Sequence, residues 1–483
     1  MAILNAFDYR RSEVVFGVVA AVGTDTSQLG LVLREHLKRF NYQVDEIKLS
    51  AYLQLPKVRK KHGARLRLRN EADRINSLMD AGNRLREALK QKEVLALWAA
   101  SDIGARRLPE REASAPVVRV LYTLKRPEEV ETLRQIYGPG FFLIGVYASE
   151  QSRIRHLIEK REISRKQALS LVKRDQEEAD DWGQRTRGTF TLADVFLELD
   201  GGVDNFHEEV RRFVDLVFGC PTATPTPAEN AMFLAHAASL RSADLSRQVG
   251  AVVVSHNGEV IGAGANDVPR FGGGLYWPGV DDRRDHVKGS DSNKVEIERI
   301  AAGIVGELFP KARGTEREDF IRQVVAHTRL NDLTEFGRPV HAEMEALLQC
   351  ARSGVSPAGG SMYTTTFPCH NCAKHIVAAG ITKVFFVEPY PKSKALELHD
   401  DAICVETETQ EKVSFLPFVG IGARRYFDLF SMRISSGREM KRKTGTDAMK
   451  FDRGAASPRV AMLPTSFLER EQLAGAIIRA KME

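Results

Sequence analysis

The sequence lacks the features of secreted, membrane-bound or strongly basic proteins. Its 483 residues include five cysteines, too few for a disulfide framework in a chain of this size. The longest apolar runs, VGAVVVS and FFLIGVYA among them, have the length of a β-strand and are far too short to span a bilayer. No apolar stretch of signal-peptide length follows the first charged residues. We therefore expect a cytoplasmic protein without a membrane partner.

The charge balance is moderate and the cysteines are unevenly placed. The net charge of +6 favours phosphate-bearing ligands but is well below the basic excess of a dedicated nucleic-acid binder. Cys220, Cys350 and Cys404 stand alone, and we interpret them as ordinary buried thiols. The other two, Cys369 and Cys372, have a Cys-x-x-Cys spacing. In a cytosolic protein this spacing indicates metal or redox chemistry.

The length exceeds that of one ordinary domain, and one segment divides the chain. Residues 220–230 read CPTATPTPAEN, in which three prolines among small residues interrupt both helix and strand. We find no internal repeat. The predicted division is a first domain at 1–220, a linker at 221–230, a second domain at 231–432, and a basic tail with a terminal helix at 433–483.

Before the linker, apolar strands alternate with helices. The expected strands cover residues 14–21, 42–50, 117–124, 141–148 and 192–199. The expected helices cover residues 26–40, 66–91, 94–106, 127–138, 150–182 and 205–218. This alternation predicts an α/β fold whose parallel sheet is covered on both faces.

After the linker, a helix at 228–240 precedes a hairpin. The expected hairpin strands are 249–255 and 259–266, and two later strands cover 361–366 and 381–389. A long insertion, about residues 267–339, follows the hairpin and contains helices between 293 and 327. Two further helices begin near His341 and Cys369.

Three potential metal ligands lie at the starts of these last two helices. His341 belongs to His-Ala-Glu, and Cys369 and Cys372 belong to Pro-Cys-His-Asn-Cys. This pattern is the signature of zinc nucleobase deaminases. One histidine and two thiolates fill three tetrahedral positions and leave the fourth for water, as a catalytic zinc ion requires. Helix amino termini also stabilise thiolate and hydroxide.

Glu343 is the expected proton carrier. Zinc lowers the pKa of bound water from about 15.7 to about 7, which supplies hydroxide for attack on C4 of cytosine. Glu343 follows the histidine by two residues and does not easily serve as a ligand itself. It is placed to take the proton of the water, protonate N3 and pass a proton to the departing ammonia.

Two other interpretations of this pattern remain. A structural zinc site needs a fourth protein ligand, for which His370 and His375 are the nearby candidates. A redox Cys-x-x-Cys pair does not need the upstream His-x-Glu. Asn266, at the end of the hairpin, is suited to bind a sugar hydroxyl or a base edge, although asparagine is also common in turns.

The second half, from about 228 to 390, resembles the deoxycytidylate deaminase branch of the cytidine deaminase superfamily. The resemblance rests on RSADLSRQVGAVVV, on Gly-x-Asn-x-x-Pro, and on the two metal motifs. It implies a mixed five-stranded sheet flanked by helices and one zinc ion per chain. It also implies that Asn266 contacts the sugar or base and that Tyr390 lies near the nucleotide.

The whole chain resembles the two-domain bacterial deoxycytidine nucleotide deaminases of anti-phage defence, whose first domain is similar to P-loop nucleotide kinases. This resemblance implies deamination of dCTP or dCMP and depletion of the nucleotide pool. It also implies a homo-oligomer, a nucleotide effector, and restraint by a small inhibitory RNA or a protein partner.

The insertion departs from simpler deoxycytidylate deaminases. It contains Arg270, Arg283, Arg284 and Lys288, whose charges match phosphate oxygens. As a group they are the candidates for substrate phosphate recognition, with Arg270 the principal one. The alternative is a solvated loop in which nearby aspartates balance these charges. A second metal at His286 is not claimed, because no cysteine accompanies it.

In the first half, FGVVAAVGTDTSQLG has the strand–turn–helix order of a phosphate-binding loop. Backbone amides around Gly23, Thr24 and Asp25 are the candidate phosphate cradle. The Walker lysine is missing, because Thr24 takes its place, and Asp25 repels phosphate unless Mg²⁺ or a basic group intervenes. Arg153 and Arg155 follow a strand, as in kinase lids, or belong to a charged helical face. We interpret this half as a kinase-like regulatory or sensing domain.

Three functions follow from the sequence. The first is hydrolytic deamination of a free deoxycytidine nucleotide. The second is deamination of a base in tRNA or single-stranded DNA, for which the basic tail MKRKTGTDAMKFDR is the supporting feature. The third is a nucleotide-sensing interaction protein with a structural zinc ion, against which the carboxylate of Glu343 argues.

Overall fold

The computed structural model describes residues 12–61, 66, 69–106, 116–176, 178, 181–390, 393–405, 408–435, 437–462 and 464–482. The first eleven residues, where we expected no signal sequence, and part of the helix expected at 66–91 lie outside these ranges. The chain forms two compact units. Unit 1 comprises Met1–Glu229 and Val419–Glu483, and unit 2 comprises Asn230–Phe418.

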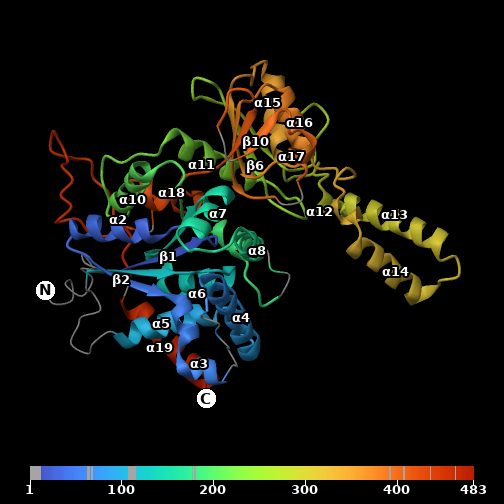
Figure 1. The fold of residues 1–483 in the computed structure, drawn as a ribbon. Helices are drawn as coiled ribbons and strands as arrows, with labels where there is room; N and C mark the ends of the chain where they lie inside the picture. Colours follow the sequence, from blue (N-terminus) through green and yellow to red (C-terminus); the bar gives the residue numbers. More distant parts are fainter. Residues whose placement is uncertain are drawn as a thin grey trace. The chain divides into compact units, whose positions relative to one another are not determined.

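Unit 1 is built on a six-stranded sheet (Figure 1). Its order is β12-β5-β4-β1-β3-β2, and every neighbouring pair is parallel except β12 with β5. The strands are β1 (Val14–Ala20), β2 (Gln43–Lys48), β3 (Val117–Tyr122), β4 (Phe141–Tyr147), β5 (Val195–Glu198) and β12 (Gly420–Ile421). The central strands β1 and β4 are almost completely buried. The expected parallel sheet, covered on both faces, is therefore confirmed.

Helices follow the strands of unit 1 in the predicted alternation, with additional short elements after β2. The 3₁₀ helix η1 (Leu49–Gln54) and α3 (Pro56–Lys61) were not predicted. The longer helices are α2 (Ser27–Lys38), α4 (Glu71–Leu89), α5 (Val94–Arg106), α6 (Pro127–Tyr137), α7 (Glu150–Glu159), α8 (Arg165–Gln176), α10 (Val203–Val217) and α19 (Pro464–Met482), with the short α9 (Thr186–Phe190).

The end of the chain belongs to unit 1, which differs from the predicted division. Unit 2 ends at Phe418, whereas the sequence placed the second domain at 231–432. The physical reason is that β12 pairs with β5 and α19 packs against α5. Phe467 and Ile478 of α19 are buried, so this helix supplies part of the unit 1 core. Helix α11 (Pro227–Ser239) begins inside the predicted linker.

Unit 2 also contains a six-stranded sheet, of order β10-β11-β9-β8-β6-β7. The hairpin β6–β7 and the pair β6–β8 are antiparallel, and the remaining pairs are parallel. The strands are β6 (Gly250–Val254), β7 (Val260–Ala265), β8 (Ser361–Thr366), β9 (Lys383–Glu388), β10 (Ile403–Val405) and β11 (Val413–Pro417). The sheet is mixed, as expected, but the short edge strand β10 makes it six-stranded rather than five-stranded.

The helix that carries the metal motif packs very closely on the hairpin. A Cβ at Gly262 would lie 2.5 Å from the carbonyl oxygen of Ala346, and a Cβ at Gly264 would lie 2.2 Å from that of Ala342. Both alanines belong to α15 (Ala342–Ser353). Glycine at these two positions lets the backbones of β7 and α15 approach, which fixes the start of α15 against the sheet.

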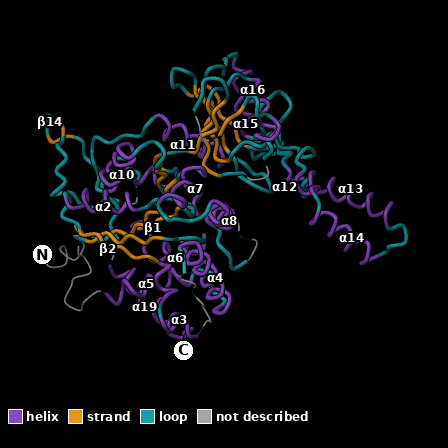
Figure 2. Tube along the Cα trace, viewed as in Figure 1, coloured by secondary structure: helices purple, strands orange, loops and turns teal. Residues whose placement is uncertain are grey.

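The insertion folds into helices and loops of unit 2. It contains α13 (Ser292–Leu308) and α14 (Gly314–His327), which lie where helices were expected between 293 and 327. The short α12 (Asp285–Lys288) and the 3₁₀ helix η3 (Arg329–Asp332) were not predicted. Figure 2 shows α13 and α14 as a helical hairpin. Phe309 and Phe320 stack at 4.6 Å between centroids to hold its two helices together. Among the described helices of the chain, none has both the length and the apolar character of a bilayer span.

Candidate active site

Two helix amino termini position the metal motif, as the sequence predicted. His341 is the N-cap residue of α15, and Cys369 is the N-cap residue of α16 (His370–Ala378). The backbone amide of Cys372 donates a hydrogen bond to the sulfur of Cys369 at 3.4 Å. Both helices present unpaired amides and the positive end of the helix dipole near the ligand atoms.

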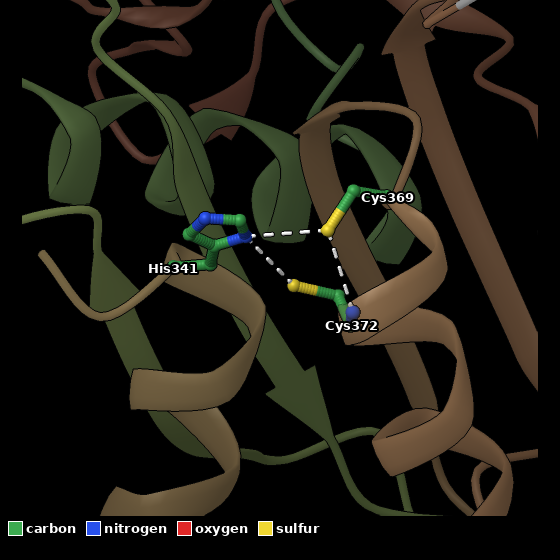
Figure 3. A group of neighbouring side chains, drawn as sticks. All are labelled: His341, Cys369 and Cys372. Carbon is green, nitrogen blue, oxygen red and sulfur yellow. Dashed lines mark hydrogen bonds between the residues drawn. The ribbon is translucent and has the colours of Figure 1, made fainter. Parts of the chain in front are cut away.

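The three predicted ligands converge on one point (Figure 3). Nδ1 of His341 lies 3.3 Å from the sulfur of Cys369 and 3.3 Å from that of Cys372. All three ligand atoms lie within 4.8 Å of one another. Zinc bonds of about 2.3 Å to sulfur and about 2.0–2.1 Å to nitrogen separate tetrahedral ligands by roughly 3.6 Å. The residues therefore fit a zinc ion with three protein ligands.

The two thiols are electrostatically unequal. A hydrogen bond from Cys372 lowers the pKa of the Cys369 thiol, and the nearby His341 acts in the same direction. The same hydrogen bond, together with burial, raises the pKa of Cys372. Metal ions bind cysteine as the thiolate, so both sulfurs have to release the protons they carry when a metal ion binds.

Glu343 faces the same group from the first turn of α15. Its side chain is 4% exposed, and Oε2 accepts a hydrogen bond from the sulfur of Cys372 at 3.5 Å. Burial raises the pKa of Glu343 to about 7, and the neighbouring Cys369 thiolate acts in the same direction. A carboxyl group with this pKa can accept or release a proton near neutral pH.

A cavity of about 390 Å³ opens in front of this group. It is lined by the motif residues, by the loop before β6, and by parts of the insertion. Beyond His341, Glu343 and Cys369, the lining includes Asp244, Ser246, Arg247, Asn266, Asp285, Asp291, Asn293, Thr334, Phe367 and Tyr390. The predicted substrate residues Asn266 and Tyr390 therefore share one cavity with the metal motif.

Asn266 is nearly buried, and its amide is already engaged. Its Oδ1 accepts from the backbone amide of Val249, and its Nδ2 donates to the carbonyl of Arg247, both at 2.7 Å. One N–H and one lone pair of the amide remain for another partner. Asn266 therefore also fixes the backbone of the segment that carries Arg247.

Arg247 is the site residue that sequence reasoning did not single out. Among the described residues that line the cavity, it is the single arginine or lysine. Its guanidinium lies 5.6 Å from the ring centroid of Tyr390 and forms an ion pair with Glu388 at 2.9 Å. It falls within the quoted segment RSADLSRQVGAVVV, but nothing in its local sequence distinguished it from a surface arginine.

The basic residues predicted in the insertion lie elsewhere. Arg270 does not line this cavity but a separate hollow of unit 2, where its Nε donates to the carbonyl of Gly273. Arg284 is buried in ion pairs with Asp282 and Asp267. Arg283 and Lys288 are not among the described lining residues either. The insertion contributes mainly acidic and neutral groups to the cavity.

The other histidines near the motif are not part of the ligand group. His370 lies 3.9 Å from Glu335, and Nδ1 of His375 bonds the carbonyl of Asn371 at 2.7 Å. His286 lies 3.7 Å from Asp282. Within the described ranges, the candidate metal group contains His341, Cys369 and Cys372 alone. A fourth protein ligand, which a structural zinc site requires, is not found there.

Several polar groups of the predicted phosphate loop already form hydrogen bonds with other groups of unit 1. The amide of Val22 donates to Asp175 at 2.7 Å, and that of Thr24 donates to the carbonyl of Ala21 at 3.1 Å. Asp25 accepts from the amide of Ser27 at 3.0 Å, so a carboxylate already lies at the start of α2. Gly23 adopts a φ of +91°. The cradle role of Gly23, Thr24 and Asp25 stays a prediction.

The two arginines expected near a kinase lid have different environments. Arg153 is buried and donates to the carbonyl oxygens of Val22 and Ala148, so it supports the loop. Arg155 donates to the hydroxyl of Ser152 on the exposed face of α7. Neither observation assigns a ligand to them.

Comparison with known proteins agrees with this site. Residues 225–388 match the model of the cytidine and deoxycytidylate deaminase zinc-binding region. The deoxycytidylate deaminase of Enterobacteria phage T2 is 30% identical over 167 residues, which cover 35% of this chain and 82% of that enzyme. The chain belongs to the cytidine and deoxycytidylate deaminase family. Nearly all of the residues matched by the family model belong to unit 2, which contains the metal motif and the cavity.

A further relative and two solved structures are each similar to part of the chain. ComE operon protein 2 of Bacillus subtilis (strain 168) is 36% identical over 91 residues, 16% of this chain and 48% of that protein, so the chain spans about half of it. The deoxycytidylate (dCMP) deaminase of cyanophage S-TIM5, solved with dCMP and dUMP, is 22% identical. The match covers 40% of this chain and 98% of that enzyme, with a TM-score of 0.24. A gluconokinase from Sinorhizobium meliloti 1021 is 15% identical. The match covers 42% of this chain and 91% of the gluconokinase, also with a TM-score of 0.24.

Proposed function

We propose that unit 2 hydrolytically deaminates a deoxycytidine nucleotide, dCMP or dCTP, to the deoxyuridine nucleotide and ammonia. The observation that carries the proposal is the convergence of His341, Cys369 and Cys372 beside the buried carboxyl of Glu343, at the wall of a cavity large enough for a nucleotide. Relatives that carry the name deoxycytidylate deaminase support the choice of substrate.

The chemistry divides between a metal and one carboxyl group. Zinc, when held by His341, Cys369 and Cys372, supplies a Lewis acid that makes a bound water acidic near neutral pH. Glu343 accepts a proton from the attacking water and holds it at its carboxyl group. It delivers this proton to N3 of the pyrimidine, then takes the remaining proton of the water from the hydroxyl group formed at C4 and passes it to the departing amine, which leaves as ammonia. The raised pKa of Glu343, caused by its burial, suits both directions of transfer.

The cavity walls position the nucleotide. Tyr390 and Phe367 provide aromatic surface for the base or sugar. The remaining N–H of Asn266 is available for a sugar hydroxyl. Arg247 is the candidate for the substrate phosphate, because it is the arginine of this cavity and lies beside Tyr390. This assignment replaces Arg270 as the principal candidate, since Arg270 lines a different hollow.

We propose a regulatory or sensing role for unit 1 and depletion of the deoxycytidine nucleotide pool in anti-phage defence as the purpose of the reaction. The support is the resemblance of the two-part sequence to bacterial deoxycytidine nucleotide deaminases and the parallel sheet of unit 1. A homo-oligomer and restraint by a small RNA or a protein partner belong to the same proposal, as does Mg²⁺ with a nucleotide in unit 1.

Ammonia release by the purified full chain tests the proposed reaction. The protein is supplied separately with dCMP, dCTP, CTP and a single-stranded oligonucleotide that contains cytosine. We expect turnover of dCMP or dCTP, with at least about tenfold lower kcat/KM on CTP and none on the oligonucleotide. The Glu343→Gln variant, assayed in parallel, serves as the inactive control. Activity on the oligonucleotide alone would instead make the chain a nucleic-acid deaminase.

A further inference from the structure

The carboxyl ends of β8 and β9 lie side by side at the active-site cavity. In this parallel pair of strands, Thr366 of β8 is opposite Glu388 of β9. Thr366 lines the cavity, and its Oγ1 donates a hydrogen bond to Oε2 of Glu388 at 3.4 Å. The backbone amide of Phe367 donates to the carbonyl oxygen of Glu388 at 2.7 Å. Glu388 is therefore held at the edge of the cavity, although it is not among the described residues that line it.

Glu388 in turn holds the guanidinium group of Arg247. Its Oε1 accepts a hydrogen bond from Nη2 of Arg247 at 2.9 Å, and the guanidinium carbon lies 5.6 Å from the ring centroid of Tyr390. The backbone of Arg247 is fixed separately, because its amide donates to Asp244 at 3.1 Å and its carbonyl oxygen accepts from Asn266 at 2.7 Å. Different residues therefore restrain the backbone and the side chain of this arginine.

The ion pair leaves Arg247 able to bind an anion. A guanidinium group carries five N–H donors, of which the contact with Glu388 takes one. Two of the other donors are enough for a two-point contact with a phosphate group. The side chain of Arg247 is also 47% exposed, so a ligand can reach it. Glu388 thus restrains the guanidinium group without occupying it.

The exposure of this ion pair argues against a role in folding. The two side chains are 47% and 40% exposed, and ion pairs at such exposure contribute little to stability. An arginine side chain that moves freely loses this freedom when it binds a ligand, and the loss weakens binding. Restraint before binding reduces the loss. The negative charge of Glu388 repels a phosphate group, but water and salt screen exposed charges, so we expect the restraint to dominate.

We infer that Glu388 is a positioning residue for the substrate phosphate and acts through Arg247. The inference rests on the proposed function, in which Arg247 receives the phosphate of a deoxycytidine nucleotide. Glu388 sets the position of the guanidinium group without touching the reacting atoms. Its loss should therefore weaken nucleotide binding and leave the chemical step, which depends on the metal motif and Glu343, nearly unchanged.

Steady-state kinetics of the zinc-loaded full chain test this role. Glu388→Ala removes the carboxylate, Glu388→Gln keeps an oxygen that accepts from Arg247, and Arg247→Ala is prepared with and without Glu388→Ala. The matched control is Glu408→Ala, which removes an exposed carboxylate paired with Lys383 at the opposite end of β9. The substrate is dCMP or dCTP. The inhibitors are dUMP and deoxyuridine, which differ by the phosphate group alone.

Glu388→Ala should raise KM about three- to tenfold, the effect of releasing one immobilised side chain, with kcat within about twofold of the parent. Glu388→Gln should restore most of this loss, and Glu408→Ala should not change KM. The Ki of dUMP should rise together with KM, whereas the Ki of deoxyuridine should stay constant. In the Arg247→Ala background, Glu388→Ala should change KM by less than about twofold, because the effect passes through Arg247.

The positioning role is overturned if Glu388→Ala lowers KM or leaves it unchanged. It is also overturned if this variant weakens dUMP and deoxyuridine equally, or if its effect persists in the absence of the Arg247 side chain. A parent chain that neither turns over nor binds a deoxycytidine nucleotide would overturn the proposed function, and the positioning role with it.

Discussion

Glu343→Gln should reduce kcat for dCMP or dCTP by roughly 10⁴-fold, the upper end for loss of one general acid–base group. The amide keeps the size of the carboxyl but cannot take a proton from water and deliver it to the pyrimidine. Because Glu343 is not one of the three converging ligands, the zinc content should stay near one ion per chain. The measurements are ammonia release and metal analysis on the same preparation.

A matched control lies on the same helix turn. Glu345 is also buried, but it pairs with Arg352 at 2.5 Å and does not line the active-site cavity. Glu345→Gln keeps an oxygen for Arg352 and should retain turnover within a few fold of the parent. Equal losses in the two variants would show that removing any buried charge from α15 disturbs the site. Full turnover by Glu343→Gln would refute the proton-carrier role.

Cys369→Ser should lose the metal ion and destabilise unit 2. Cys369 is one of the three converging ligands and also caps α16, so its removal affects both the ligand set and the helix start. Metal–thiolate bonds are coupled to folding. We expect zinc content below about one tenth of an ion per chain and an unfolding temperature lower by about 10 °C, corresponding to a few kcal/mol.

Cys404→Ser separates the ligand role from the general effect of losing a thiol. Cys404 lies in the edge strand β10, is partly exposed, and is outside the metal group. This variant should keep its zinc and unfold within about 2 °C of the parent. Zinc bound at full occupancy by Cys369→Ser would contradict the ligand assignment, whatever its effect on stability.

The metal motif was predictable because its information is local. His341, Cys369 and Cys372 each stand at a helix start, and two helices that begin on the same edge of a sheet bring such residues together. Hydrophobic alternation likewise predicted the parallel sheet of unit 1, since strands buried on both faces are apolar throughout. These features need no knowledge of distant contacts.

The substrate side of the cavity was not predictable in the same way. Arg247 is brought to Tyr390 by tertiary packing, and Asn266 fixes the backbone of the segment that carries Arg247. The arginines of the insertion were chosen for their charge, but Arg284 is neutralised by two aspartates. Asp282 is close to it in sequence, whereas Asp267 is not. Charge on a sequence does not reveal which charges are already paired.

The end of the chain shows a third limit. Gly420–Ile421 forms too short a strand for any periodicity to appear, and it pairs with β5, which is far away in sequence. Helix α19 was expected near its observed position, yet the surface of α5 that it covers could not be inferred from its own residues. Contacts between segments separated by several hundred residues therefore decide the extent of unit 1.

The central claim is that this chain adds water to a deoxycytidine nucleotide with Glu343 as the proton carrier. The most direct test is turnover of dCMP and dCTP in H₂¹⁸O by the zinc-loaded full chain, with mass spectrometry of the product. We predict a deoxyuridine nucleotide that carries one ¹⁸O at C4, formed together with one ammonia and absent with Glu343→Gln. A product without the label, or an unchanged yield from Glu343→Gln, would contradict the account.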